Sequence, residues 1–219
     1  MTGREFKDIT FQQFAKIANA FSSPKRLEVI DILSQGERDV DTLAKETNMN
    51  FANTSRHLQI LKHSKLITAR KEGVRVVYSL ADSEVFKCWK SLQELAEKTT
   101  SEIREVTKLF FEERLALEPI SMNELAKKLE EENITLIDVR PKEEYKNGHI
   151  PKAISLTLTD LKADNFKLPK NKKIVAYCRG QYCVLAAEAA RFLNNQGYKV
   201  TIMKDDINQW KQLGLPVEK

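Results

Sequence analysis

At 219 residues, with 42% hydrophobic and 31% charged side chains, the chain has the composition of a soluble globular protein and the length of one large domain or two ordinary ones. It contains no run of about 18 apolar residues and no signal-peptide core near its first residues, so we predict a cytoplasmic protein with no membrane partner. Its net charge of +5 is matched by residues 50–75 alone, where six Lys or Arg accompany one acid.

The first half of the sequence is predicted to be helical. Apolar residues recur at helical spacing from Phe11 to Phe21, and Ser23 and Pro24 suit the N-cap and first turn of a second helix. A short helix over residues 41–46 and a third helix after the turn at 48–50 would have the layout of a helix-turn-helix.

A β-hairpin is predicted next. Two β-rich runs flank Glu72-Gly73 and place Arg75 close to the tip, and a helix-turn-helix followed by such a basic hairpin is a winged helix. Hydrogen-bonding and cationic side chains suited to base edges and phosphates gather on the third helix and the hairpin. The predicted DNA-binding residues are Asn53, Thr54, Ser55, Arg56, His57, Gln59, Lys62 and Arg75. We therefore predict a double-stranded DNA operator as partner.

The residues from Thr54 to Lys62 and from Lys71 to Leu80 resemble the arsenical-repressor (ArsR/SmtB) family, and the resemblance extends over about 10–115. It implies a homodimeric bacterial repressor whose recognition helix enters the major groove. Metal-sensing members place cysteines on the helix before the recognition helix, but residues 39–47 contain no Cys or His. We therefore predict no metal site and no cofactor.

A single long helix is predicted from about Ser83 towards Leu115. Its apolar positions alternate spacings of four and three, which is typical of a packing seam. The seam consists of Val85, Trp89, Leu92, Ala96, Thr99, Ile103, Val106 and Phe110. Its length favours dimerisation over packing within one small domain, and Cys88 beside Trp89 is expected to pack in the core.

The second half switches to alternating strands and helices. The pattern around Glu118–Ser121 breaks the long helix, so we place a DNA-binding and dimerisation domain at 1–118 and a second domain at 119–219. Strands are predicted at 135–139, 154–156, 174–177 and 198–202, with helices between them. The predicted fold is therefore multidomain, a mainly α winged helix followed by an α/β domain with a parallel sheet.

The segment Cys178–Cys183 closes one of these strands and opens a helix. Three cysteines in the chain, without the spacing of a disulfide framework, indicate free thiols. A thiol at a helix N-terminus beside Arg179 is expected to have a lowered pKa, so Cys178 is predicted to be the most reactive thiol. A cysteine phosphatase is excluded because it needs Cys-x5-Arg, and position 184 is Val.

Residues 136–140, 143–145, 148–153 and 178–180 together resemble the rhodanese family of sulfurtransferases, and the resemblance covers about 119–219. It implies that Cys178 accepts a sulfane sulfur and becomes a persulfide, inside a loop whose backbone N–H groups face the bound sulfur. The candidate site residues are Cys178, Arg179, Gly180, Gln181, Tyr182 and Cys183. Arg179 is expected to assist an anionic donor, and Asp138, Arg140 and His149 to brace the loop.

Two features of this half favour a sensor over a catalyst. Asp205-Asp206 stands where rhodaneses commonly carry a Gly pair, so carboxylates near the pocket would repel an anionic donor. Cys183 is a second thiol that can attack a persulfide on Cys178. We therefore predict a transcriptional repressor that senses a sulfane-sulfur donor, thiosulfate or a persulfide. A sulfurtransferase tethered to DNA, with weak turnover, and a general thiol-redox sensor are the alternatives.

Overall fold

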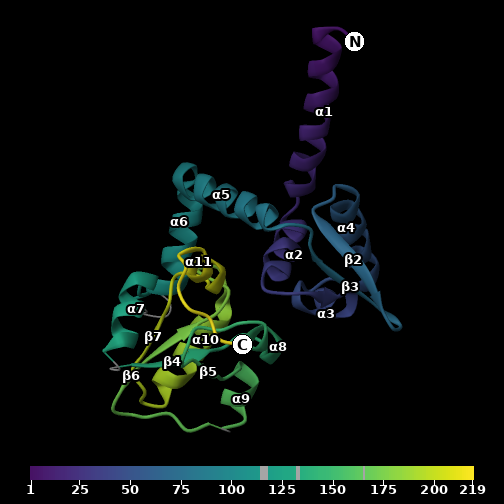
Figure 1. Ribbon diagram of the computed structural model, residues 1–219. Coiled ribbons are helices and arrows are strands. Elements are labelled where there is room, and N and C mark those ends of the chain that lie inside the picture. The colour runs from purple at the N-terminus through teal and green to yellow at the C-terminus, as the bar shows by residue number, and fades with distance from the viewer. Residues whose placement is uncertain (114–117, 132–133, 165) are drawn as a thin grey trace. The chain divides into compact units, whose positions relative to one another are not determined.

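The computed structural model describes residues 1–113, 118–131, 134–164 and 166–219 (Figure 1). Its contacts divide the chain into two compact units, Met1–Thr99 and Thr100–Lys219. Each unit has its own buried apolar core, so each is described by itself.

Helices and a small sheet form the first unit. The core between them contains Val29, Ile30, Leu43, Leu58 and Leu61, all less than 2% exposed. The helices are α1 (Gly3–Phe21), α2 (Pro24–Ser34), α3 (Val40–Glu46), α4 (Phe51–His63) and α5 (Ser83–Thr99). The two predicted helices, the short one and the one after the turn at 48–50, are thus confirmed as α3 and α4.

An antiparallel sheet completes this unit, with strand order β1-β3-β2. The strands are β1 (Arg38–Asp39), β2 (Ile67–Glu72) and β3 (Arg75–Leu80). Because Glu72 pairs with Arg75, only Gly73 and Val74 form the turn, and Gly73 adopts the positive φ of 61° that such a tight turn requires. The predicted hairpin is confirmed, and it projects from the helices of its unit (Figure 1).

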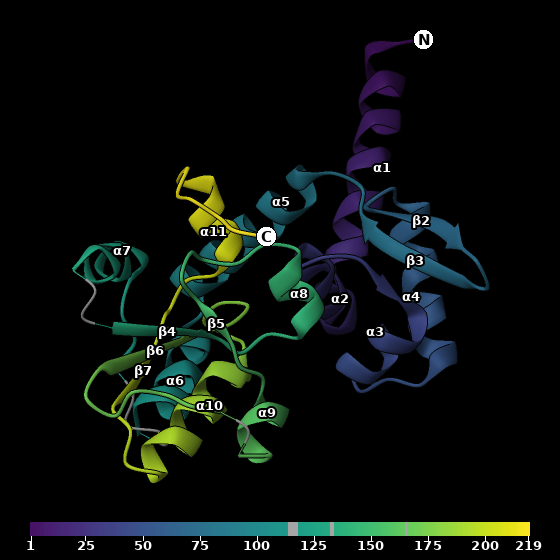
Figure 2. The ribbon, with the colours of Figure 1, turned by 60° about the horizontal axis from the view of Figure 1, so that its bottom comes forward.

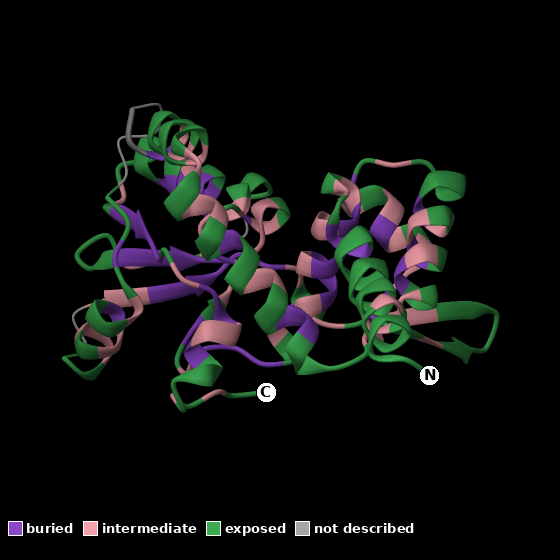
Figure 3. Cartoon of the chain, turned by 90° about the horizontal axis from the view of Figure 1, so that it is seen from above, coloured by how far each residue is buried: buried purple, intermediate pink, exposed green. Residues whose placement is uncertain are grey.

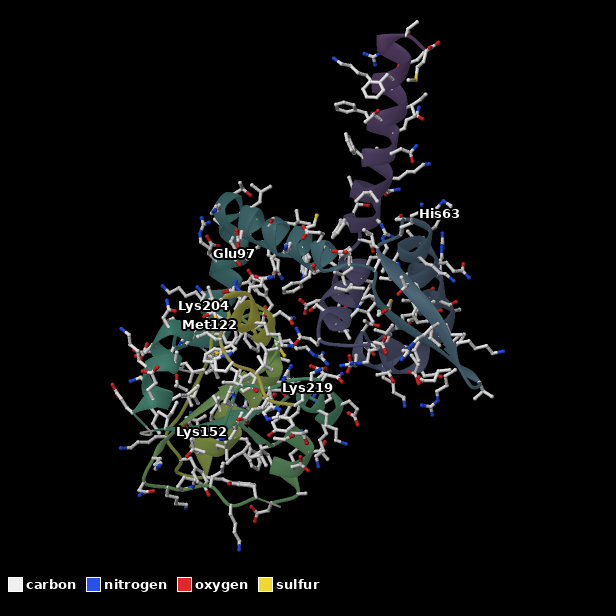
Figure 4. The ribbon with its side chains drawn as sticks, viewed as in Figure 1. His63, Glu97, Met122, Lys152, Lys204 and Lys219 are labelled. Atoms are coloured by element: carbon white, nitrogen blue, oxygen red, sulfur yellow. The ribbon has the colours of Figure 1, made fainter. Side chains whose placement is uncertain are left out.

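Helix α1 extends beyond the rest of its unit. Only Ala20 and Phe21 at its C-terminal end are buried, whereas Phe6, Phe11 and Phe14 are 55%, 66% and 61% exposed. Figure 4 shows side chains along α1 that stand clear of the other elements of the unit. The helix therefore presents an uncovered apolar surface, more than a monomeric soluble domain usually leaves in water.

The prediction of one long helix after the hairpin is wrong. The helix is interrupted at Thr100, whose backbone is extended (φ −116°, ψ 108°), and α6 (Ser101–Lys108) then begins. A short π-helix, η1 (Leu109–Glu113), follows α6, and its residue Phe111 is buried in the core of the second unit. Burial of Phe111 in the core of the second unit thus competes with continuation of the apolar seam along one straight helix. The predicted end of that helix, Leu115, lies outside the described residues.

The second unit is built on a parallel four-stranded sheet, as predicted, with strand order β5-β4-β6-β7. The strands are β4 (Ile134–Asp138), β5 (Ile154–Ser155), β6 (Lys173–Tyr177) and β7 (Val200–Ile202). The helices are α7 (Met122–Glu130), α8 (Lys142–Lys146), α9 (Leu158–Lys162), α10 (Val184–Asn195) and α11 (Ile207–Gln212). Among these helices, α9 has no counterpart in the sequence-based expectation.

Alternate residues of each strand supply the two faces of this sheet. In β6, Ile174 and Ala176 enter one core with α9 and α10, whereas Val175 and Tyr177 enter another with α7 and α11. Figure 2 shows α7 and α11 on one side of the sheet and α9 and α10 on the other, and Figure 3 shows the strands buried between them. Covering both faces explains why the strands are continuously apolar.

Candidate functional site

The Cys178–Cys183 loop joins the carboxyl end of β6 to the N-terminus of α10, which is where open parallel sheets place their ligands. Cys183 is the N-cap residue of α10, and its N–H donates to the Gly180 carbonyl at 3.0 Å. That turn requires the positive φ of 104° at Gly180. Cys178 is only 2% exposed, Gln181 is partly buried, and Tyr182 is 43% exposed.

The turn brings Cys178 and Cys183 together. The Cys178 thiol donates to the Cys183 carbonyl oxygen at 3.4 Å, so the side chain of Cys178 lies directly against Cys183. Both cysteines are free thiols. Two neighbouring thiols can share one proton and can be joined by a sulfur bridge.

The expectation that Cys178 has a lowered pKa is wrong. Burial raises the pKa of Cys178 well above its ordinary value, and the backbone N–H groups of Ala186 and Arg179 only partly oppose this. The hydrogen bond from Cys178 instead lowers the pKa of Cys183, which is also the residue at the helix N-cap. The sequence pattern locates the helix start correctly, but it cannot measure how deeply the first thiol is buried.

Arg179 is held by a carboxylate on α8. Its Nε donates to both oxygens of Glu144, at 3.1 and 3.3 Å, and Nη2 makes a further hydrogen bond to Oε1. Glu144 is fully buried and Arg179 is 12% exposed on its side chain. The guanidinium charge is therefore matched by a buried carboxylate, which weakens the predicted role of Arg179 in holding an anionic donor.

Asp138 and Arg140 brace the strand ends beneath the loop. The carboxylate of Asp138 accepts from Arg140 Nε at 3.0 Å, and Arg140 Nη2 donates to the Gly148 carbonyl at 2.9 Å. The Arg140 guanidinium also lies 5.6 Å from the ring centroid of Tyr177, the residue before the loop. These contacts support the scaffold role assigned to both residues.

His149 lies in the same layer. Its ring stacks on Tyr145 at a centroid distance of 3.7 Å, and Nδ1 is 3.0 Å from the Tyr145 carbonyl oxygen. Its backbone pairs with Glu218 near the end of the chain. These contacts fix the segment that follows α8 and do not involve the two cysteines.

Asp205 and Asp206 both bind backbone N–H groups. Asp206 is 1% exposed and caps α11 by accepting from Asn208 and Gln209, at 2.8 and 2.9 Å. It also lies directly behind the loop, because a Cβ atom on Gly180 would come within 3.3 Å of the Asp206 Cβ atom. Asp205 accepts from the N–H of Met122 at 2.9 Å. Asp206 therefore does lie beside the loop, as anticipated, with its charge engaged by a helix N-terminus.

Most of the predicted DNA-binding residues lie at the surface of α4 and β3. Asn53, Arg56, Gln59, Lys62 and Arg75 are exposed, whereas Ser55 and His57 are partly buried. Thr54 is a correction to the set, because it is fully buried and its hydroxyl donates to the Asn50 carbonyl at 2.9 Å. Helical periodicity turns this one side chain into the core.

Two carboxylates outside the hairpin form ion pairs with its arginines. Arg75 is 3.5 Å from Asp39, and Arg70 is paired with Glu37. Asn50, which the sequence-based set omits, caps α4 by accepting from the Asn53 N–H at 2.8 Å. Its position directly before the recognition helix is the signal that could have identified it.

Cys88 lies at the surface, so its predicted place in the core is wrong, while Trp89 beside it donates to Asp31 at 3.0 Å. The described residues hold no cluster of three metal-binding side chains. Within the same residues, none of the helices has the length and apolarity needed to cross a bilayer.

Two family profiles match the chain. The profile "Bacterial regulatory protein, arsR family" matches residues 23–69, which include α2 to α4, and the profile "Rhodanese-like domain" matches residues 121–213. The first match contains the candidate DNA-binding helix, and the second contains the Cys178–Cys183 loop.

Three curated relatives show how these parts combine. The HTH-type transcriptional regulator Rv0324 of Mycobacterium tuberculosis is 35% identical over 97% of this chain and 93% of its own length. A sulfurtransferase of Allochromatium vinosum is 31% identical over 39% of this chain and 79% of its own. A transcriptional repressor SmtB homolog of Synechocystis is 32% identical over 37% of this chain and 61% of its own. The chain belongs to the arsR-family HTH-type transcriptional regulators, in the form that carries a C-terminal rhodanese-like domain.

Proposed function

We propose that this regulator is a homodimeric repressor that releases DNA when a sulfane-sulfur donor modifies the Cys178–Cys183 pair. One observation carries the proposal, namely that the thiol of Cys178 lies 3.4 Å from the carbonyl oxygen of a second free cysteine, Cys183, in the loop between β6 and α10. A regulator with such a pair has a reversible chemical switch inside the same chain as its DNA-binding domain.

The first chemical step is transfer of one sulfur atom to Cys178. Its proton passes along the hydrogen bond to Cys183, and the resulting thiolate is stabilised by the N–H groups of Arg179 and Ala186. The Cys178 thiolate attacks the outer sulfur of a donor R–S–SH, so that a new S–S bond forms as the donor's S–S bond breaks. The group RS⁻ leaves and takes up the proton now held by Cys183, so that Cys178 carries a persulfide and Cys183 is left as a thiolate.

The second step uses Cys183. Its thiolate attacks the inner sulfur of the Cys178 persulfide, which forms a Cys178–Cys183 disulfide and expels HS⁻. The donated sulfane sulfur is thereby reduced to sulfide, and the two thiols are oxidised, so no further oxidant is needed. A reducing thiol in the cell would restore the starting state.

Two contacts support sensing over steady turnover. Arg179 is occupied by Glu144, and Asp206 lies against Gly180, so the loop offers an anionic substrate little positive charge. Sulfurtransferase activity is nevertheless a second candidate, because a relative that matches this half of the chain is named a sulfurtransferase.

The proposed dimer and DNA contacts belong to the first unit. The exposed apolar residues of α1 and the exposed Leu92 and Leu95 of α5 form a surface suited to a second copy of the chain. Two copies would place two α4 helices for successive major grooves, with Asn53, Arg56 and Gln59 towards base edges. Lys62 and Arg75 would contact phosphates.

The experiment uses the full-length protein and a duplex selected in vitro for binding to it. Fluorescence anisotropy would measure binding before and after addition of a persulfide donor, and mass spectrometry would identify the modified loop peptide. Release of DNA with added sulfur on Cys178 or a Cys178–Cys183 bridge is expected. Thiosulfate:cyanide turnover without any effect on DNA would favour the sulfurtransferase, and release by peroxide alone would favour a general thiol-redox sensor.

A further inference from the structure

Residues Asp205 and Asp206 lie between the cysteine loop and the linker that enters the rhodanese-like domain. We propose that they couple the two, so that modification of the Cys178–Cys183 pair shifts residues 118–122. This inference rests on the proposed function, and it concerns the route by which the modified loop acts on the rest of the chain.

The first contact lies at the loop. Gly180 packs directly on Asp206, with no room for a Cβ atom at ordinary van der Waals distance. Asp206 is fixed in turn, because its carboxylate accepts from two N–H groups of α11 and its own N–H donates to Gln209 at 3.1 Å. A displacement of Gly180 therefore meets a rigid side chain and is passed to the backbone of residues 205–206.

The second contact lies at the linker. The Asp205 carboxylate accepts from the N–H of Met122, the first residue of α7, at 2.9 Å. Ile120 donates to the Ile202 carbonyl at 2.8 Å and accepts from the Lys204 N–H at 3.0 Å. Residues 118–120 thus lie along the edge of β7 as an added parallel segment, directly before α7 begins.

The linker has space in which to move. Glu118, Pro119 and Ile120 border a pocket of about 520 Å³ that reaches the start of β6 and β7. Upstream of the linker, Phe111 of η1 belongs to the same buried cluster as Cys178. The segment leading back to the DNA-binding domain is therefore attached to the rhodanese-like core on both sides of residues 114–117.

Modification would disturb these contacts because it adds volume at Cys178. Cys178 is 2% exposed inside a close-packed core, so an added sulfur atom or a new bridge to Cys183 must displace the loop backbone around Gly180. Asp206 takes up that displacement, and the bond between Asp205 and Met122 weakens or changes geometry. The linker then loses one of the hydrogen bonds that hold it on β7.

The test compares Asp205→Ala with Asp205→Asn, whose side-chain carbonyl can still accept from Met122, and with Glu188→Ala, which removes an exposed carboxylate from α10 of the same domain. Hydrogen exchange of the peptide covering residues 118–124 would be followed in each full-length protein with and without a persulfide donor. In wild type, Asp205→Asn and Glu188→Ala, the donor should raise exchange by at least about twofold. In Asp205→Ala, exchange should be raised already and the donor should add nothing.

Donor-induced release of the selected duplex provides the second measurement. Wild type should lose at least about tenfold in affinity, and Asp205→Ala less than about threefold, although mass spectrometry finds its loop fully modified. Exchange at 118–124 that does not change in modified wild type would overturn the coupling. If exchange rises as expected and DNA is retained, the coupling stands and the proposed function fails.

Discussion

At the scale of single residues, the two thiols of the loop have opposite environments. Burial raises the pKa of Cys178, whereas the hydrogen bond from Cys178 lowers that of Cys183. When the pair loses a proton, the negative charge therefore lies mainly on Cys183, and Cys178 becomes a nucleophile only when its own proton is transferred to Cys183. This division of roles follows from burial, which the sequence does not report.

Changing Cys178 to Ala should slow alkylation of Cys183. The variant removes the donor that lowers the Cys183 pKa, so at pH 7 less of this thiol is ionised, and the iodoacetamide rate should fall by at least about threefold. The rate profile should shift to higher pH. Cys88→Ala serves as the control and should leave the Cys183 rate unchanged, and an unshifted profile in Cys178→Ala would contradict the assignment.

The buried pair of Asp138 and Arg140 should dominate local stability. Asp138→Asn leaves the Arg140 guanidinium, 1% exposed, without its carboxylate, and removing one partner of a buried pair typically costs about 3–5 kcal/mol. The free energy of unfolding in urea would measure the loss. Lys142→Ala, which breaks a partly exposed pair with Asp160, should cost at most about 1 kcal/mol, and equal losses would refute the distinction.

At the scale of elements, α4 and the β2–β3 hairpin present the cationic surface of the first unit. Arg56 and Arg75 are both exposed, and Arg75 is already 3.5 Å from Asp39. In the proposed complex, a phosphate contact by Arg75 would therefore replace its ion pair with Asp39. Because the ion pair with Asp39 is lost, Arg75 would contribute less to the free energy of DNA binding than an arginine that has no acidic neighbour.

Replacement of Arg56 by Ala should weaken DNA binding and lower the slope of log affinity against log salt by about one. Arg75→Ala should also weaken DNA binding, but by a smaller factor than Arg56→Ala. Lys146→Ala, an exposed lysine of α8, is the control and should leave the slope unchanged. An unchanged slope in Arg56→Ala, measured by anisotropy over a salt series, would remove this residue from the interface.

Dimerisation is predicted to depend on α1 and α5. The double variant Phe14→Asp, Leu92→Asp places charges on the exposed apolar surface of both helices and should yield monomers that no longer bind the selected duplex tightly. Sedimentation velocity would measure the mass. Leu213→Asp changes an exposed apolar residue directly after α11, and this variant should dimerise like wild type. A dimeric double variant would exclude the surface of α1 and α5.

At the scale of the whole molecule, the sequence predicts both fold types and most of the elements, but not β1 or α9. The succession of apolar strand segments and helical segments, with the turn residues around Gly73 and Gly180, carries that information. The break at Thr100 is not predicted, because the apolar spacing continues across it, whereas the burial of Phe111 in the second unit depends on contacts that local spacing does not encode.

The candidate site is predicted in position and only partly in chemistry. The strand-to-helix junction identifies Cys178 and Cys183, but the partners of the charged residues lie far away in sequence. Glu144 binds Arg179 across 35 positions, and Asp205 binds Met122 across 83. Such long-range contacts depend on topology, which local spacing does not encode.

Sulfur-dependent release of DNA by Cys178 tests the central claim most directly. Wild type, Cys178→Ser, Cys183→Ser and Cys88→Ser would each be bound to the same duplex and titrated with a persulfide donor. Wild type and Cys88→Ser should lose at least about tenfold in affinity, Cys183→Ser should gain a persulfide but respond weakly, and Cys178→Ser should stay bound. Donor-induced release that persists in Cys178→Ser would contradict the account.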